Sequence, residues 1–76
     1  MTDVKTYIDF YKDERNSALL YEALAGMETD ERLAGVYKRL AETEIRHAQT
    51  WVEKLAQLGH PEPKFKPDWQ THVLIW

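Results

Sequence analysis

Glu44 and His47 interrupt a stripe of apolar residues in the middle of a long helical stretch, and no other feature constrains the fold as strongly. They are three residues apart, so on a helix they lie on one face, one turn from each other. The apolar residues that flank them at helical spacing are Leu33, Tyr37, Leu40, Trp51, Leu55 and Leu58. A carboxylate or an imidazole buried without a partner is costly, so the rest of the chain is expected to supply that partner.

The length and composition of the chain limit how a partner can be supplied. A chain of 76 residues forms one small domain, and domains of this size usually need disulfides, a metal or self-association. The sequence contains no cysteine, which excludes disulfides and thiolate zinc sites. A metal held by histidine and carboxylate, or self-association, remains.

The charge pattern and the N-terminus argue against several classes of protein. The net charge is −3 with both signs interspersed, whereas a nucleic-acid-binding surface would be a basic stripe. No apolar run approaches the roughly 20 residues of a membrane span. Residues 1–4 do not begin a secretory signal. We therefore expect a cytoplasmic protein with no nucleic-acid partner.

Two long helices, at residues 4–27 and 30–58, are expected on either side of a short turn. Ala, Leu, Glu and Lys, which favour helices, dominate the second half of the first stretch. A short turn between two such helices gives an antiparallel hairpin, so the expected fold class is all-α. The residues expected to cap the helices are Asp3, Thr29 or Asp30, and Gly59.

The chain divides into a helical hairpin at residues 1–59 and a C-terminal part at residues 60–76. Prolines at 61, 63 and 67 exclude a regular helix there and predict an extended, Pro-rich arm. Asp68 is suited to cap a short terminal helix at residues 69–76.

The first helix carries a carboxylate of its own, Glu14, in its apolar stripe. If the hairpin pivots at Thr29, then Glu14 lies about 15 residues before the pivot and Glu44 about 15 residues after it. The two side chains should therefore meet at the same height, with His47 one turn further along. Tyr21 lies two turns from Glu14 in the direction of the turn.

Two facing carboxylates repel each other unless a proton or a cation lies between them. Oxygen and imidazole ligands together suit first-row transition metals, and Fe, Mn and Zn all accept them. One hairpin supplies only Glu14, Glu44 and His47 and leaves a broad apolar face uncovered. A second copy would cover that face and complete four Glu and two His, the ligand set of a di-metal site in a four-helix bundle. We therefore predict a homodimer or a higher even oligomer.

Less specific interpretations stand beside the metal site. Glu-x-x-His alone is common on solvated helix faces. If the apolar stripe is slightly rotated, Glu14, Glu44 and His47 lie at its edge in water, and Glu42 becomes the buried partner. We expect instead that Glu42 faces solvent or lies behind the ligands, because it falls off the stripe. Tyr21 either packs in the core, or hydrogen-bonds a ligand carboxylate or acts near a redox metal.

Four residues and their surroundings resemble a known family. Glu14 and Tyr21 lie in the sequence ERNSALLYEALA, and Glu44 and His47 lie in AETEIRHA. This pattern resembles the ferritin-like di-iron superfamily, in its rubrerythrin branch. Residues 7–76 resemble more narrowly the rubrerythrin-like part of bacterial proteins that continue into a vacuolar-iron-transporter-like membrane domain. The spacing of the four residues is also similar to that of the two-helix encapsulated ferritins.

The resemblance implies two hairpins that form a ferritin-like four-helix bundle, with two iron ions bound at each dimer interface. Mn or Zn are substitutes, because they accept the same ligands. It implies that Glu14 is a terminal carboxylate ligand, Glu44 a bridging ligand and His47 a terminal nitrogen ligand. Tyr21 would lie beside the site as the candidate catalytic residue. The implied activity is that of a ferroxidase, which oxidises Fe²⁺ to Fe³⁺ with O₂ or peroxide, for iron storage, detoxification or transport.

The chain departs from the family in lacking the second hairpin of a complete rubrerythrin-like domain and a cysteine centre for electron relay. Two alternatives to a ferroxidase therefore stay open. One is a non-catalytic metal-sensing or metal-loading domain of an iron or manganese transporter, tethered to a membrane in a longer natural chain. The other is a helical dimerisation module without metal.

Overall fold

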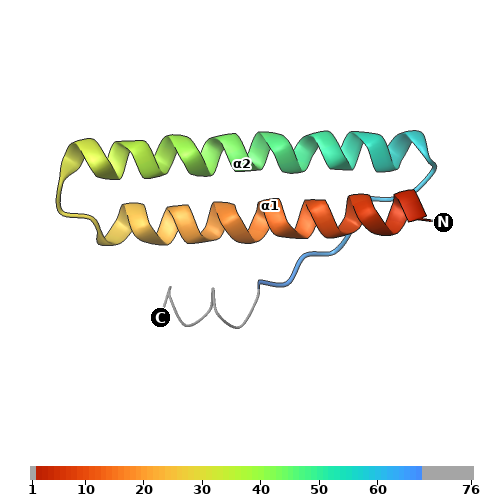
Figure 1. The fold of residues 1–76 in the computed structure, drawn as a ribbon, viewed down its shortest axis with the longest axis horizontal. Coiled ribbons are helices and arrows are strands. Elements are labelled where there is room, and N and C mark those ends of the chain that lie inside the picture. Colours follow the sequence, from red (N-terminus) through yellow and green to blue (C-terminus); the bar gives the residue numbers. More distant parts are fainter. Residues whose placement is uncertain (1, 68–76) are drawn as a thin grey trace.

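The chain folds into two helices that pack side by side and run in opposite directions (Figure 1). The computed structural model describes residues 2–67, in which α1 is Thr2–Met27 and α2 is Glu31–Gln57. The prediction of an all-α hairpin is confirmed. The helix α1 begins two residues earlier than expected, so Asp3 lies in its first turn and is not the N-cap. A carboxylate in that turn suits the positive end of the helix dipole.

The start of α2 is fixed by the side chain of Asp30. Its carboxylate accepts hydrogen bonds from the backbone N–H of Arg32 at 2.9 Å and of Leu33 at 3.2 Å. These are donors that the first turn of a helix leaves without an intrahelical partner. Asp30, and not Thr29, is therefore the N-cap, and α2 begins at Glu31 and not at residue 30.

The end of α2 is a Schellman motif around Gly59. Gly59 has a positive φ of 77°, its N–H donates to the carbonyl of Ala56, and the N–H of His60 donates to the carbonyl of Leu55. A left-handed residue at this place is normally glycine, because other residues are strained there. The predicted role of Gly59 is confirmed, and Leu58 is the C-cap, one residue beyond the last helical residue Gln57.

A narrow line of small and apolar side chains joins the two helices. The buried residues of this seam are Tyr11, Ala18, Ala41, Ala48 and Leu55. Alanines at the contact allow the helix axes to approach closely. Part of the predicted apolar stripe of α2 is not in the seam, since Leu33, Leu40 and Leu58 are 40%, 37% and 52% exposed. These leucines belong to the apolar side that a single hairpin was expected to leave uncovered, because α2 turns Ala41, Ala48 and Leu55 towards α1 and the leucines lie beside that line.

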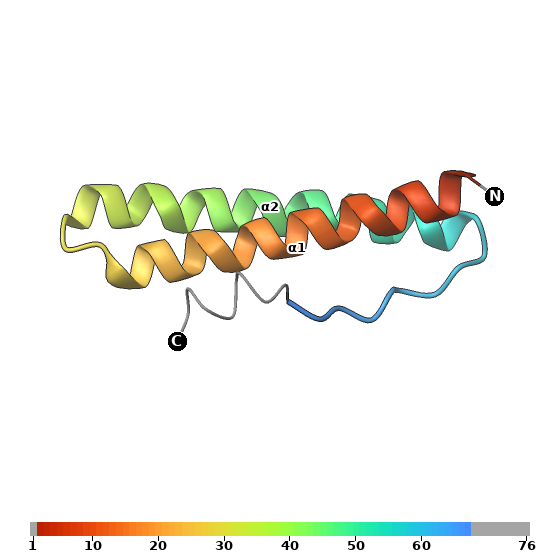
Figure 2. The same cartoon turned by 60° about the horizontal axis from the view of Figure 1, so that its bottom comes forward.

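Residues 60–67 form no helix or strand and return along α1 towards the turn (Figures 1 and 2). Tyr11 ties this segment to the hairpin, since its hydroxyl donates to a carboxylate oxygen of Glu62 at 3.4 Å and accepts from Arg15 at 2.6 Å. Phe65 meets the Tyr11 ring edge-on, and the Arg15 guanidinium lies 4.6 Å from the centre of the Phe65 ring. The segment therefore covers Tyr11, which is 2% exposed. The terminal helix expected at residues 69–76 lies outside the described residues.

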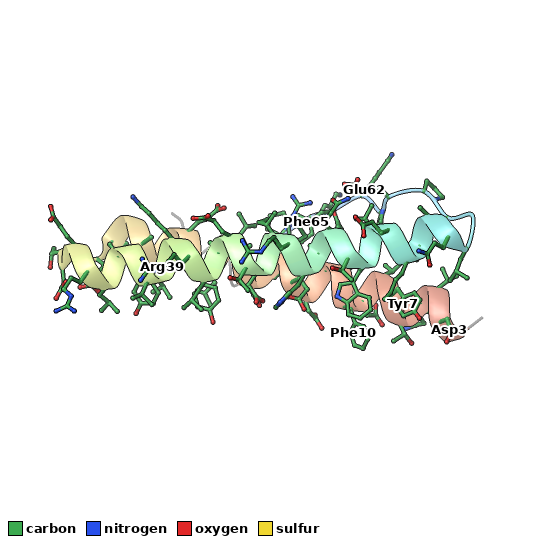
Figure 3. All side chains as sticks on the ribbon, turned by 90° about the horizontal axis from the view of Figure 1, so that it is seen from above. Asp3, Tyr7, Phe10, Arg39, Glu62 and Phe65 are labelled. Carbon is green, nitrogen blue, oxygen red and sulfur yellow. The ribbon has the colours of Figure 1, made fainter. Side chains whose placement is uncertain are left out.

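The hairpin has two distinct broad faces. Tyr7 and Phe10 project from one side and Glu62 and Phe65 lie on the opposite side (Figure 3). The rings of Tyr7 and Phe10 pack against Trp51 of α2, with centroids 5.4 Å and 4.9 Å away. We call these two sides the Phe10 face and the Phe65 face.

Neither helix in the described part of the chain carries an apolar stretch long enough to cross a bilayer.

Candidate metal centre

Glu14 of α1 and Glu44 and His47 of α2 converge at one height of the hairpin. One potential ligand atom from each side chain lies within 4.8 Å of the other two. The Nδ1 atom of His47 is 3.3 Å from Oε2 of Glu14 and 3.4 Å from Oε1 of Glu44. The register prediction is therefore confirmed, because residues at equal distances from the turn of an antiparallel hairpin lie opposite each other.

The three side chains lie at the edge of the seam. The side chains of Glu14 and Glu44 are 23% and 22% exposed, and that of His47 is 54% exposed. In one hairpin the cluster is therefore open on the side of His47, as the interpretation with a rotated stripe expects. A second polypeptide or solvent has direct access to the imidazole.

Glu42 is not a member of this cluster. It is exposed and lines a groove on the other side of the seam, together with Glu22 and Ile45. The expectation that Glu42 faces solvent is confirmed, and the alternative that made it the buried partner is wrong. The physical reason is the helical rotation of about 200° between residues two apart, which turns Glu42 away from Glu44.

The surroundings of Glu44 favour its neutral form. Partial burial raises the pKa of the Glu44 carboxyl above its ordinary value, and the hydrogen bond and negative charge of Glu14 raise it further. His47 acts in the opposite direction and lowers this pKa. Glu14 and Glu44 therefore repel each other when both are ionised, and a bound cation would reduce this repulsion.

Replacing Glu44 by glutamine is therefore expected to stabilise the metal-free protein at neutral pH. A raised pKa means that the folded chain binds the proton more tightly than the unfolded chain. Protonation of Glu44 therefore adds to the free energy of unfolding at pH values below 4.5, the ordinary pKa of a Glu carboxyl. This contribution is lost as the pH rises through the higher pKa of the folded chain. The glutamine side chain stays neutral throughout. Urea titrations with a chelator present, between pH 4 and pH 7, should show an advantage for Glu44→Gln that grows with pH.

The control for this pH series is Glu42→Gln, because Glu42 is exposed two residues away on the same helix. Its stability difference from the wild-type chain should stay flat with pH. An advantage of Glu44→Gln that is largest at pH 4, or equal for both variants, would contradict the assignment of repulsion to the pair of Glu14 and Glu44.

A small open hollow of about 270 Å³ adjoins the cluster, lined by Glu14, His47, Thr50 and Trp51. Trp51 belongs to the predicted apolar stripe, and it packs against Tyr7 and Phe10. Its indole N–H is nevertheless buried without a hydrogen-bond partner in the described part of the chain. The signal in the sequence was its spacing of four residues from His47, which places it one turn along on the same face.

Tyr21 lies further towards the turn and packs against another aromatic ring. Its ring is stacked on that of Tyr37, with centroids 6.4 Å apart. This contact accords with the packing interpretation of Tyr21, and its predicted catalytic role stays a prediction.

The donor set fits a divalent first-row metal. Two carboxylates and one imidazole combine oxygen and nitrogen ligands, which suit Fe, Mn and Zn. Three protein ligands leave coordination positions free for water, a substrate or further side chains. The class of protein that fold and site define is thus a helical hairpin with a candidate carboxylate–histidine metal centre at the edge of its seam. No protein-family model, curated protein or solved structure matches this chain.

Proposed function

We propose that this protein binds iron at a di-metal site completed by a second copy of the chain, and that it oxidises Fe²⁺ to Fe³⁺. The observation that carries the proposal is the convergence of Glu14, Glu44 and His47, whose ligand atoms lie within 4.8 Å of one another. The three come from two helices, and Glu44 and His47 form a Glu-x-x-His pair. Four-helix di-metal carboxylate proteins use this pair on two helices and a single Glu on each of the other two.

The Phe10 face supports the involvement of a second copy. Large apolar side chains on this side stay exposed in one hairpin, with Phe10 at 42%, Leu33 at 40% and Leu40 at 37%. Exposed apolar patches of this kind mark protein interaction sites. Leu40 and His47 are seven residues apart and share a side of α2. Two copies that bury this face against each other would bring two clusters together and double the ligands to four Glu and two His.

In this proposal Fe²⁺ is the substrate. Glu14 and Glu44 would supply negative charge that favours the ferric over the ferrous ion, and Glu44 would be the ligand shared by the two ions, as the family resemblance implies. The His47 of each of the two copies would supply an imidazole nitrogen ligand to one of the ions. Two Fe²⁺ give up one electron each, and with two protons these reduce one O₂ to hydrogen peroxide. The role of the chain is to hold two ions at a spacing of about 3.5–4 Å with open positions for the oxidant.

The test is to load the full chain anaerobically with Fe²⁺, measure its mass by analytical ultracentrifugation, and then admit oxygen. We expect the mass to shift to a dimer or higher even oligomer on loading, because ligands that bind the assembled site favour assembly. Oxygen uptake and ferric absorbance should then rise at least about tenfold faster than in buffer with the same iron, a modest rate enhancement for an enzyme. Glu44→Gln should lose this acceleration, while Glu42→Gln should retain it.

Each outcome separates the candidate functions. Iron binding and assembly without accelerated oxidation would replace the ferroxidase by a metal-sensing or metal-loading domain. A chain that stays monomeric and takes up no Fe²⁺ would contradict the metal centre altogether.

A further inference from the structure

The Phe65 face carries a groove that the candidate metal centre does not use. The groove has a volume of about 450 Å³ and is lined by Glu22, Lys38, Ala41, Glu42, Ile45 and Arg46. The surface that lines the groove is mainly apolar, although four of these six residues are charged. Ala41 is buried in the seam and Ile45 is 44% exposed. Charged side chains of both signs surround this apolar strip. Such a groove suits an apolar segment of polypeptide.

The course of residues 60–67 leads towards this groove. Glu62 contacts Tyr11, and Phe65 contacts both Tyr11 and Arg15, so the chain advances along α1 towards the turn. Arg15 and Glu22 are seven residues apart and lie on the same side of α1, two turns from each other. Phe65 therefore packs on the same side of α1 that forms one wall of the groove further on.

The groove also begins at the position along the hairpin that Phe65 reaches. Glu14 and Glu44 lie opposite each other, so their chain neighbours Arg15 and Ile45 are at nearly the same height of the hairpin. On α2 the groove begins at Arg46 and Ile45 and extends towards the turn as far as Lys38. Phe65, which packs on Arg15, therefore lies close to its near end.

We propose that this groove is the binding site of the segment that follows Pro67, residues 69–76 of the same chain. That segment consists mainly of large apolar side chains, namely Trp69, Val73, Leu74, Ile75 and Trp76. From Lys38 to Arg46 the groove spans about 12 Å of α2, and the eight residues 69–76 reach about 12 Å as a helix and further when extended. Because the segment is tethered at the mouth of the groove, its effective concentration there is of millimolar order. A second copy of the chain has no such advantage.

If the segment binds there, the two faces of the hairpin have different roles. The segment 69–76 would cover the Phe65 face, and the Phe10 face would stay open for a second copy. The inference needs no metal, so its failure would leave the proposed iron site untouched.

The test uses engineered cysteine pairs, because the chain has no cysteine of its own. A disulfide requires Cα atoms within about 7 Å. The full chain with Ile45→Cys and Val73→Cys should form an intramolecular disulfide in a glutathione buffer. The matched control carries Leu40→Cys with the same Val73→Cys, since Leu40 is 37% exposed on the other face. We expect the Ile45 pair to form its disulfide with at least tenfold higher effective concentration.

The disulfide is detected by mass spectrometry after tryptic digestion. Leu40 and Ile45 lie in the same tryptic peptide, residues 40–46, and Val73 lies in the peptide of residues 65–76, so both variants link the same two peptides. Equal disulfide formation at both positions would overturn the proposal. A disulfide of the Ile45 pair that forms between chains would also overturn it, and would assign the groove to a second copy. If Ile45→Cys lowers the helical circular-dichroism signal, Glu42→Cys at the exposed rim of the groove replaces it, with the same expectation.

Discussion

Substituting His47 with alanine should remove most of the stabilisation that Fe²⁺ gives to the protein. A ligand at 100 times its dissociation constant stabilises the folded state by about 2.7 kcal/mol. In a domain of this size each kcal/mol raises the melting temperature by about 4–8 °C, so the wild-type chain should gain roughly 11–22 °C. His47→Ala should gain little, because the cluster loses its nitrogen ligand and keeps two carboxylates. Anaerobic thermal unfolding with and without Fe²⁺ measures the difference.

The control for this measurement is His60→Ala. The ring of His60 contacts the carbonyl of Pro61 at 2.6 Å and takes no part in the cluster. Its variant should therefore gain as much from Fe²⁺ as the wild-type chain. Without metal, His47→Ala should melt close to the wild-type temperature, because the His47 side chain is 54% exposed. An undiminished metal-dependent gain in His47→Ala would remove this residue from the ligand set.

Substituting Leu55 with alanine should cost about 2–5 kcal/mol of folding free energy, as is typical for fully buried leucines. Leu55 is 0% exposed and is one of the two largest side chains that the hairpin buries fully. A chain of this length has roughly 4–11 kcal/mol of stability at 0.05–0.15 kcal/mol per residue. The substitution therefore removes a large part of the total. Urea unfolding followed by circular dichroism should show a lower midpoint with an unchanged slope.

Leu58→Ala separates packing from helix formation in this experiment. Leu58 is three residues away and 52% exposed, so its variant should stay within about 0.5 kcal/mol of the wild-type chain. Alanine is the best helix former, so neither substitution weakens α2 itself. Equal losses in the two variants would mean that the predicted stripe, and not the seam of alanines, joins the helices.

The limits of the helices could be predicted from the sequence because they depend on local chemistry. Asp30 caps α2 through hydrogen bonds to N–H groups two and three residues away. Gly59 ends it with a backbone conformation that suits glycine. Interactions over so few residues depend on the residues themselves, although the sequence left the choice between Thr29 and Asp30 open. The expectation that failed, Asp3 as N-cap, concerned a helix that begins one residue before Asp3.

The meeting of Glu14 with Glu44 could be predicted as well, although the two are 30 residues apart. In an antiparallel hairpin with a short turn, the position of the turn decides which residues of the two helices lie opposite each other. Counting residues from the turn in both directions therefore predicts the pairs. His47 then follows from its spacing of three residues on α2. The cluster of three ionisable side chains is thus a consequence of helix geometry and of the position of the turn.

The contacts of residues 60–67 could not be predicted in this way. Tyr11 and Glu62 are 51 residues apart, and the segment between the helix end and Phe65 has no periodicity that fixes a register. Only its packing on the hairpin brings Phe65 onto Arg15. The buried N–H of Trp51 beside the cluster is likewise a result of packing with Tyr7 and Phe10.

The sequence by itself determined the two helices, the turn, the glycine that ends α2 and the height at which Glu14, Glu44 and His47 meet, and it left Thr29 and Asp30 open as the N-cap. The tertiary structure alone decided the rotation of α2 about its axis. A stripe pattern is satisfied by a range of rotations, and the close approach of Ala41 and Ala48 to α1 selects one of them. That rotation leaves Leu33, Leu40 and His47 exposed on the Phe10 face, where the cluster is open to a partner.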